Sequence, residues 1–195
     1  MRQIRFYFDF LSPYSYLAST QLVSLAQRTG TTIDYRPINV LQLMERVGNQ
    51  PTTVLCEAKL RYAFQDLARW AGDYNVPLNP NPHLRTIDVN PLLRGALAAR
   101  HADCAETYIA TVFKGYWIDA SSFDNREELL DMLLNANIPN AGELLEHGDS
   151  LQPELDRNID AAIEDGVFGV PSFVSRDRLY FGNDRLHFLE RECAE

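Results

Sequence analysis

The sequence predicts an α/β fold in which both ends of the chain build one sheet and the middle of the chain is helical. Two features predict it. Near the start, residues 3–18 change from a strand pattern to a helix pattern, with Ser12 at the junction. Far downstream, the apolar run 167–174 carries Pro171 at the point where a strand would begin. Because proline is poorly tolerated inside a sheet, we expect the Val170-Pro171 bond to enter a strand and to be cis.

These two features together are the layout of a thioredoxin-like domain, in which a cis-proline loop faces the start of the first helix. We therefore predict a thioredoxin-like fold that is split by a large all-helical insertion. Residues 1–39 and 151–195 are expected to form the thioredoxin-like domain, and residues 40–150 the helical insertion. A chain of 195 residues is long enough for one core that carries such an insertion.

The first two elements follow from hydrophobic periodicity. Alternating apolar residues predict a strand over 3–10, and apolar residues at helical spacing predict a helix over 13–29. Pro13 fits the first helical position, and Gly30 fits the residue that ends the helix. Ser12 is then the N-cap, and one interpretation is that it only caps the helix. The other is that the free N–H groups of this helix end hold a thiolate or another anion.

The remaining elements are placed by caps, prolines and periodicity. A second strand over 32–37 completes a βαβ start. The expected elements of the middle are an amphipathic helix over 58–71, a proline-rich loop near 77–82, a helix capped by Asn90 to about 101, a helix capped by Asp103 to about 117, a helix start at Asp124, and helices divided by Pro139 and Pro153. The end of the chain is expected to form strands over 172–175 and 179–181, then a helix over 184–192 capped by Asn183 or Asp184.

Composition excludes several classes of function. The net charge of −9 argues against a nucleic-acid partner and against an anionic membrane surface. No apolar stretch approaches the roughly 18 residues that span a bilayer, and no secretory signal is visible. The widely spaced Cys56, Cys104 and Cys193 form no C-x-x-C pair and have no histidine at metal-ligand spacing. We therefore expect unpaired thiols, no metal site and a cytoplasmic location.

The helix start carries Ser12-Pro13-Tyr14-Ser15, where redox-active proteins of this fold place two cysteines. A hydroxyl cannot form a disulfide, so dithiol exchange is excluded at this position. An anion-stabilising helix end with a hydroxyl donor instead suits a thiolate brought by a ligand. Serine-nucleophile chemistry is not favoured, because none of the four histidines lies in a hydrolase motif.

The run Phe8 to Ala18 resembles the signature of 2-hydroxychromene-2-carboxylate isomerases and of kappa-class glutathione transferases, which belong to the DsbA-like branch of the thioredoxin superfamily. The resemblance continues through Lys59 to Ala71, Phe168 to Pro171 and Phe181 to Leu186, in order along nearly the whole chain. It implies a DsbA-like fold, glutathione as the cofactor, a small aromatic carboxylate as the substrate and a homodimer.

The resemblance also implies roles for particular residues. Ser12 would stabilise the glutathione thiolate, and the backbone of Val170, before Pro171, would pair with the cysteinyl part. Asn183 and Asp184 would hold the γ-glutamyl part, the alternative being that they only cap the last helix.

Asn49 and Lys59 match positions near the glutathione or the substrate carboxylate in the resembled family. Their alternatives are a turn residue and a solvated helix lysine. Tyr62, Asp66, Arg69 and Trp70 match as well, but a helix stripe of this kind favours packing, and we leave them outside the site.

The implied activity is glutathione-dependent isomerisation of 2-hydroxychromene-2-carboxylate to trans-o-hydroxybenzylidenepyruvate, or of a related intermediate of aromatic breakdown. Two alternatives stay open. One is a kappa-like transferase or peroxidase that consumes glutathione. The other is a non-catalytic module that binds glutathione or a peptide.

Overall fold

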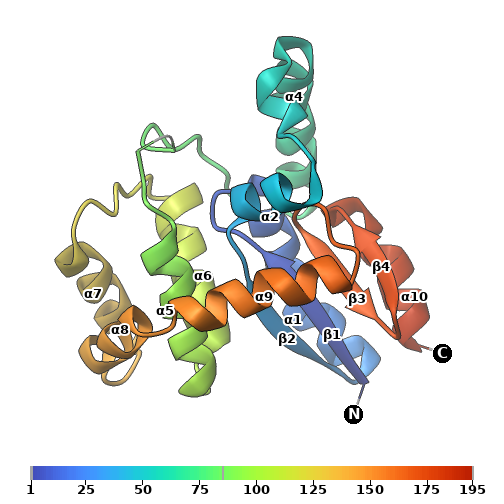
Figure 1. Cartoon of the computed structure of the whole chain (residues 1–195). Helices are drawn as coiled ribbons and strands as arrows, with labels where there is room; N and C mark the ends of the chain where they lie inside the picture. Colours follow the sequence, from blue (N-terminus) through green and yellow to red (C-terminus); the bar gives the residue numbers. More distant parts are fainter. Residues whose placement is uncertain (1, 85, 195) are drawn as a thin grey trace.

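A computed structural model describes residues 2–84 and 86–194 and shows one mixed sheet of four strands (Figure 1). The strands are β1 (Arg2–Phe8), β2 (Thr31–Pro37), β3 (Ser172–Ser175) and β4 (Arg178–Phe181), in the order β2-β1-β3-β4. β1 is parallel to β2 and antiparallel to β3, and β3 is antiparallel to β4. The prediction that both ends of the chain share one sheet is confirmed.

Between β2 and β3 the described residues form helices and loops only. These helices are α2 (Val40–Val47), α3 (Thr52–Leu55), α4 (Glu57–Asp73), α5 (Asn90–His101), α6 (Ala105–Trp117), α7 (Arg126–Asn135), α8 (Ala141–Asp149) and α9 (Gln152–Glu164). Helix α1 (Pro13–Thr29) connects β1 to β2, and a 3-10 turn η1 (Asn183–Arg185) and α10 (Leu186–Ala194) follow β4. No helix among the described residues is long and apolar enough to cross a membrane.

The two faces of the sheet bury separate clusters of apolar side chains. Phe6 and Phe8 of β1 point into the larger cluster, which includes residues of α1, α5, α6 and α10. Tyr7, on the opposite face of the same strand, belongs to a smaller cluster with residues of α2 and α9. Phe10 packs on Phe113 of α6, with ring centroids 4.8 Å apart. One core therefore joins the sheet to the helical region, and the domain division at residues 39 and 150 stays a proposal.

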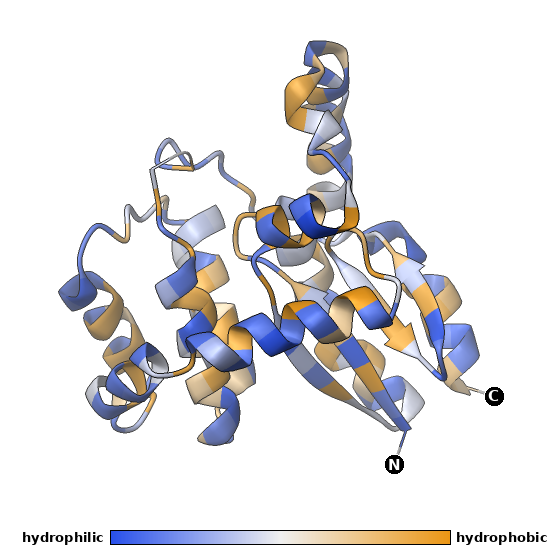
Figure 2. Ribbon diagram, viewed as in Figure 1, coloured by the Kyte–Doolittle hydropathy of each residue, from blue (hydrophilic) through white to orange (hydrophobic). Residues whose placement is uncertain are grey.

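The start of α4 projects from the body, together with α3 (Figure 1). Val54, Leu55, Tyr62 and Phe64 are exposed there, and Figure 2 shows hydrophobic colour along this projection. The sequence pattern assigned no separate helices to residues 40–55, whereas the structure places α2 and α3 in this segment.

Several predicted boundaries are confirmed and others are wrong. Ser12 caps α1 and Gly30 ends it in a left-handed conformation, as predicted. The first strand ends at Phe8 instead of residue 10, because the Asp9 carboxylate accepts a hydrogen bond from the Leu11 N–H at 2.9 Å and forms a turn.

Two predicted helix caps are also wrong. Asn90 is already the first residue of α5, so it does not cap that helix. Asp103 lies outside α6 with a φ of 54°, and no side chain caps α6. The predicted helix start near Asp124 is confirmed, because α7 begins at Arg126 and Asn125 caps it by accepting from the Glu128 N–H at 2.8 Å. Neither α5 nor α6 has a side-chain cap, and periodicity alone does not place a helix end to within one or two residues.

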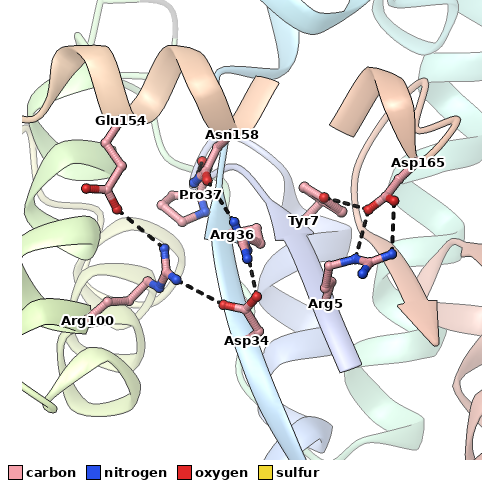
Figure 3. Close-up of polar contacts among 9 residues, drawn as sticks. All are labelled: Arg5, Tyr7, Asp34, Arg36, Pro37, Arg100, Glu154, Asn158 and Asp165. Atoms are coloured by element: carbon pink, nitrogen blue, oxygen red, sulfur yellow. Dashed lines mark hydrogen bonds and ion pairs between the residues drawn. The ribbon is translucent and has the colours of Figure 1, made fainter. Parts of the chain in front are cut away.

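Helix α9 is held across the sheet by ion pairs at both of its ends (Figure 3). At its C-terminal end, the Asp165 carboxylate accepts from the Tyr7 hydroxyl at 2.7 Å and from Arg5 at 2.9 Å. Towards its start, Glu154 pairs with Arg100, which also reaches Asp34 of β2. The C-terminal tie fixes the chain just before the loop that leads to Pro171.

We expect Asp165→Ala to lower the free energy of unfolding by about 2 kcal/mol, because the buried Tyr7 hydroxyl and Arg5 both lose their acceptor. Asp160→Ala, on the same helix, is the matched control, since its pair with Arg46 is exposed and contributes less than about 1 kcal/mol. Urea unfolding measures both. Equal losses would contradict the anchoring role of Asp165.

Candidate functional site

The strand register brings three distant segments to one edge of the sheet. Tyr7 of β1 pairs with Ser172 of β3, and Ser172 pairs with Phe181 of β4. The residues after β1, before β3 and after β4 therefore meet at the same edge. A hydrogen bond of 2.9 Å from the Gly182 N–H to the Pro171 carbonyl joins two of the segments directly. These segments carry Ser12, Val170-Pro171 and Asn183-Asp184, as the sequence predicted.

Ser12 lies at the end of this edge as the N-cap of α1. Its backbone is extended, and its Oγ accepts a hydrogen bond from the Ser15 N–H at 3.1 Å. The side chain is largely buried, with 9% of its residue surface exposed. Because the capping bond uses an Oγ lone pair, the hydroxyl proton stays available for donation to an acceptor. The arrangement can stabilise an anion at the start of α1.

Asp9 lies under the turn that carries Ser12 and is fully buried. Its two carboxylate oxygens accept from the Leu11 N–H at 2.9 Å and from the Val40 N–H at 2.8 Å. Burial raises the pKa of Asp9 to about 6, although both backbone hydrogen bonds oppose the rise. Sequence analysis missed this residue, but the signal was present: a carboxylate directly after a buried strand.

The loop before β3 contains a cis Val170-Pro171 bond, as predicted. The segment after α2 helps to position this loop, because the Asn49 side-chain amide donates to the Phe168 carbonyl at 2.8 Å. The Asn49 carbonyl oxygen accepts from the Gln50 N–H at 2.8 Å. Asn49 therefore ties the end of α2 to this loop, and its contact with a ligand stays a prediction.

Asn183 and Asp184 lie at the start of η1, but neither side chain caps it, so the predicted capping role is wrong. The Asn183 carbonyl accepts from the Tyr74 hydroxyl at 3.1 Å, and Asp184 forms an ion pair with Arg185. A cavity of about 240 Å³ lies beside them, lined among others by Trp70 and Tyr74 of the α4 region. Polar groups at its rim can hold a small zwitterionic ligand.

Lys59 lines a second, open cavity of about 450 Å³ together with Tyr14 and Tyr62. The Tyr14 hydroxyl donates to Asp66 at 3.1 Å. Burial raises the pKa of Tyr14, and the charges of Asp66 and Asp184 raise it further, so the phenol stays protonated near neutral pH. Tyr14 therefore lies near both acidic groups, at the start of α1. Tyr62 and Asp66, which sequence analysis left outside the site, lie at its border.

The described residues contain no cluster of three or more histidine, cysteine, aspartate or glutamate side chains arranged to hold a metal ion. Cys56, Cys104 and Cys193 are all free thiols, and Cys56 is exposed.

Comparison with known sequences gives consistent results. A family model described as a DSBA-like thioredoxin domain matches residues 3–194. A 2-hydroxychromene-2-carboxylate isomerase of Sphingobium xenophagum is 35% identical over 192 residues, which cover 97% of this chain and 96% of the relative. One from Pseudomonas putida is 36% identical, with coverage of 96% and 92%. Glutathione S-transferase kappa 1 of Caenorhabditis elegans is 24% identical, with coverage of 96% and 88%.

Solved structures agree with this result. The structure of a 2-hydroxychromene-2-carboxylate isomerase superimposes with a TM-score of 0.85 and 32% identity, covering 97% of this chain and 93% of the other. The cytosolic disulfide reductase DsbM of Pseudomonas aeruginosa, solved with GSH, has the same fold, with a TM-score of 0.67, 21% identity and coverage of 97% and 98%.

Asp9 is expected to make stability depend on pH. Its pKa is raised from 3.8 to about 6 in the folded protein, so its neutral form stabilises the fold. That contribution is complete below pH 3.8 and is lost as the pH rises through about 6, a loss of about 3 kcal/mol. Relative to Asp9→Asn, the free energy of unfolding of the wild type should therefore fall between about pH 4 and pH 7.5. Urea unfolding at several pH values tests this, and a difference that does not vary with pH would contradict it.

Proposed function

The chain belongs to the family of DsbA-like thioredoxin domains and, within it, to the 2-hydroxychromene-2-carboxylate isomerases, and we propose that it is a glutathione-dependent isomerase. Its substrate pair is 2-hydroxychromene-2-carboxylate and trans-o-hydroxybenzylidenepyruvate, or a related aromatic intermediate. The observation that carries the proposal is the position of Ser12. Its buried hydroxyl caps α1 at the edge where the loops of Pro171 and Gly182 meet.

The proposed reaction uses the thiolate as a reversible catalyst. The sulfur adds to the activated double bond of the ring-opened substrate. The electron pair of that double bond moves through the conjugated system onto the carbonyl oxygen. The former double bond is now single and rotates. The electron pair then returns, the double bond forms again, and the thiolate leaves, so no glutathione is consumed. The protein contributes thiolate stabilisation, positioning and exclusion of water.

The Ser12 hydroxyl and the start of α1 together are sufficient to stabilise the thiolate at neutral pH. A free thiol has a pKa of about 8.5, and lowering it by two units requires about 2.7 kcal/mol. A hydrogen bond from a hydroxyl to a charged acceptor contributes about 1.5–3 kcal/mol. The helix end adds about 0.3–1 kcal/mol. The available hydroxyl proton of Ser12 supports this role.

In this proposal glutathione lies along the sheet edge. The backbone of Val170, before Pro171, pairs with its cysteinyl part in the manner of an added strand. Asn183 and Asp184 hold the γ-glutamyl part, beside the cavity that they line. Support comes from the kappa-class glutathione transferases among the relatives and from the DsbM structure with GSH.

Lys59 is proposed to bind the substrate carboxylate. It lines the open cavity beside Tyr14 and Tyr62, so one wall offers an ammonium group and the others offer aromatic faces. That combination suits a small aromatic carboxylate. Asn49 contributes through the loop that it holds, and direct contact with glutathione or substrate is part of the same proposal.

We also propose that the enzyme is cytoplasmic and forms a homodimer. The three free thiols fit a reducing compartment, and the exposed apolar residues of α3 and α4 offer a surface that a second copy can cover. Light scattering measures the mass of the particle directly.

The kappa-class relatives favour one second candidate, a transferase or peroxidase that consumes glutathione. An assay of the chromene–pyruvate interconversion separates the two. An isomerase turns over many substrate molecules with no loss of total glutathione and is inactive without it. A transferase loses one glutathione for each conjugate, and a binding module shows no turnover.

Ser12→Ala is expected to keep the fold and most of the glutathione affinity but to lose turnover, with a cost of about 2 kcal/mol or more in transition-state stabilisation. Removal of the cap also lowers stability by about 1 kcal/mol. Asn125→Ala removes the cap of α7 at a similar cost and is expected to keep full turnover. Full turnover in Ser12→Ala would show that this hydroxyl has no catalytic role.

Asp184→Ala is expected to weaken glutathione binding more than it slows turnover at saturating glutathione. Stability should change by less than about 1 kcal/mol, because Asp184 caps no helix and its pair with Arg185 is half-exposed. Arg185→Ala is the control, since it leaves the carboxylate in place. A small thiol that lacks the γ-glutamyl group should react equally well with both variants. If Asp184→Ala weakens the binding of that small thiol as much as it weakens the binding of glutathione, the γ-glutamyl site lies elsewhere.

A further inference from the structure

The turn that presents Ser12 is built around the side chain of Asp9. The Asp9 carbonyl accepts from the Ser12 N–H at 3.1 Å, and one carboxylate oxygen accepts from the Leu11 N–H. The other carboxylate oxygen accepts from the N–H of Val40, the first residue of α2. Asp9 thus joins the end of β1, the start of α1 and the start of α2 at one point.

A carboxylate can accept from both backbone donors of this arrangement at once. Asp9 is fully buried, and among the described residues it forms no ion pair with lysine, arginine or histidine. Two backbone donors approach two different oxygens. An asparagine offers a single acceptor oxygen, so its NH₂ group would face the second donor. A buried, unpaired charge is costly, and such groups gather at functional sites.

We propose that Asp9 is a positioning residue: by accepting from Leu11 and Val40, its carboxylate fixes the turn that aims the Ser12 hydroxyl at the sulfur of glutathione. The inference rests on the proposed function of Ser12. It assigns Asp9 no contact with the substrate. Its effect passes through the backbone of residues 9–12 to the hydroxyl.

A proline at position 40 tests this without touching Asp9. Val40→Pro deletes the N–H that Asp9 accepts and changes no atom of the Asp9 side chain. Proline is tolerated at the first helical position, and the extended backbone of Asn39 suits the residue before a proline. Val40→Ala is the matched control, because it removes side-chain packing but keeps the N–H. Arg126→Pro is a second control. It places a proline at the first position of another helix, α7, after Asn125, whose backbone is also extended.

The readout is the pKa of the glutathione thiol in the complex, followed by the near-ultraviolet absorbance of the thiolate. The wild type should lower this pKa below the free value of about 8.5. Val40→Pro is expected to raise it by about half a unit or more relative to Val40→Ala. Val40→Ala and Arg126→Pro are expected to match the wild type.

Two results would overturn the proposal. One is an equal thiol pKa in Val40→Pro and Val40→Ala. The other is a difference in thiol pKa between Val40→Pro and Val40→Ala that is equally large in the Asp9→Asn background. In that background the hydrogen bond from the Val40 N–H is already disturbed, so the proposal predicts that the difference shrinks or reverses. If Asp9→Asn does not fold, the first comparison decides alone. A wild type that leaves the thiol pKa unchanged would instead reject the proposed function.

Discussion

The antiparallel pairing of β3 with β1 is the contact on which the rest of the structure depends. It joins residues 5–7 to residues 172–174, and it is where the two ends of the chain meet. Without it, Ser12 is a helix cap and Pro171 is a residue in a loop. With it, the Ser12 turn, the Val170-Pro171 loop and the Asn183-Asp184 turn lie at the same edge of the sheet. Two hydrogen bonds help to position the loop before β3. Asp165 accepts from the Tyr7 hydroxyl, and the Asn49 side chain donates to the Phe168 carbonyl.

Three carboxylates, one of them paired with Arg185, lie around the start of α1. Asp9 lies below the turn, and Asp66 and Asp184 both act on the Tyr14 hydroxyl. Carboxylates near a thiolate raise its free energy, so in the proposed complex the hydroxyl of Ser12 and the helix end must outweigh them. Lys59 lies at the border of the site, where we propose that it binds the carboxylate of the substrate.

Much of the fold could be predicted from sequence because its signals are local. The strand-to-helix change at Ser12, the left-handed Gly30 and the cis Val170-Pro171 bond each follow from residues within a few positions. Asp9 and Tyr14 were missed because their importance comes from contacts with α2 and α4, which periodicity does not bring together. The predicted caps at residues 90 and 103 were wrong because α5 and α6 begin without a side-chain cap, and a capping residue type near a helix start does not show that it caps the helix.

A crystal structure of the wild-type protein with glutathione tests the central claim most directly. The account predicts the glutathione sulfur within hydrogen-bond distance of the Ser12 Oγ, with the cysteinyl backbone paired to Val170 and the γ-glutamyl end beside Asn183 and Asp184. Glutathione bound with its sulfur away from the start of α1, at any other surface, would contradict it.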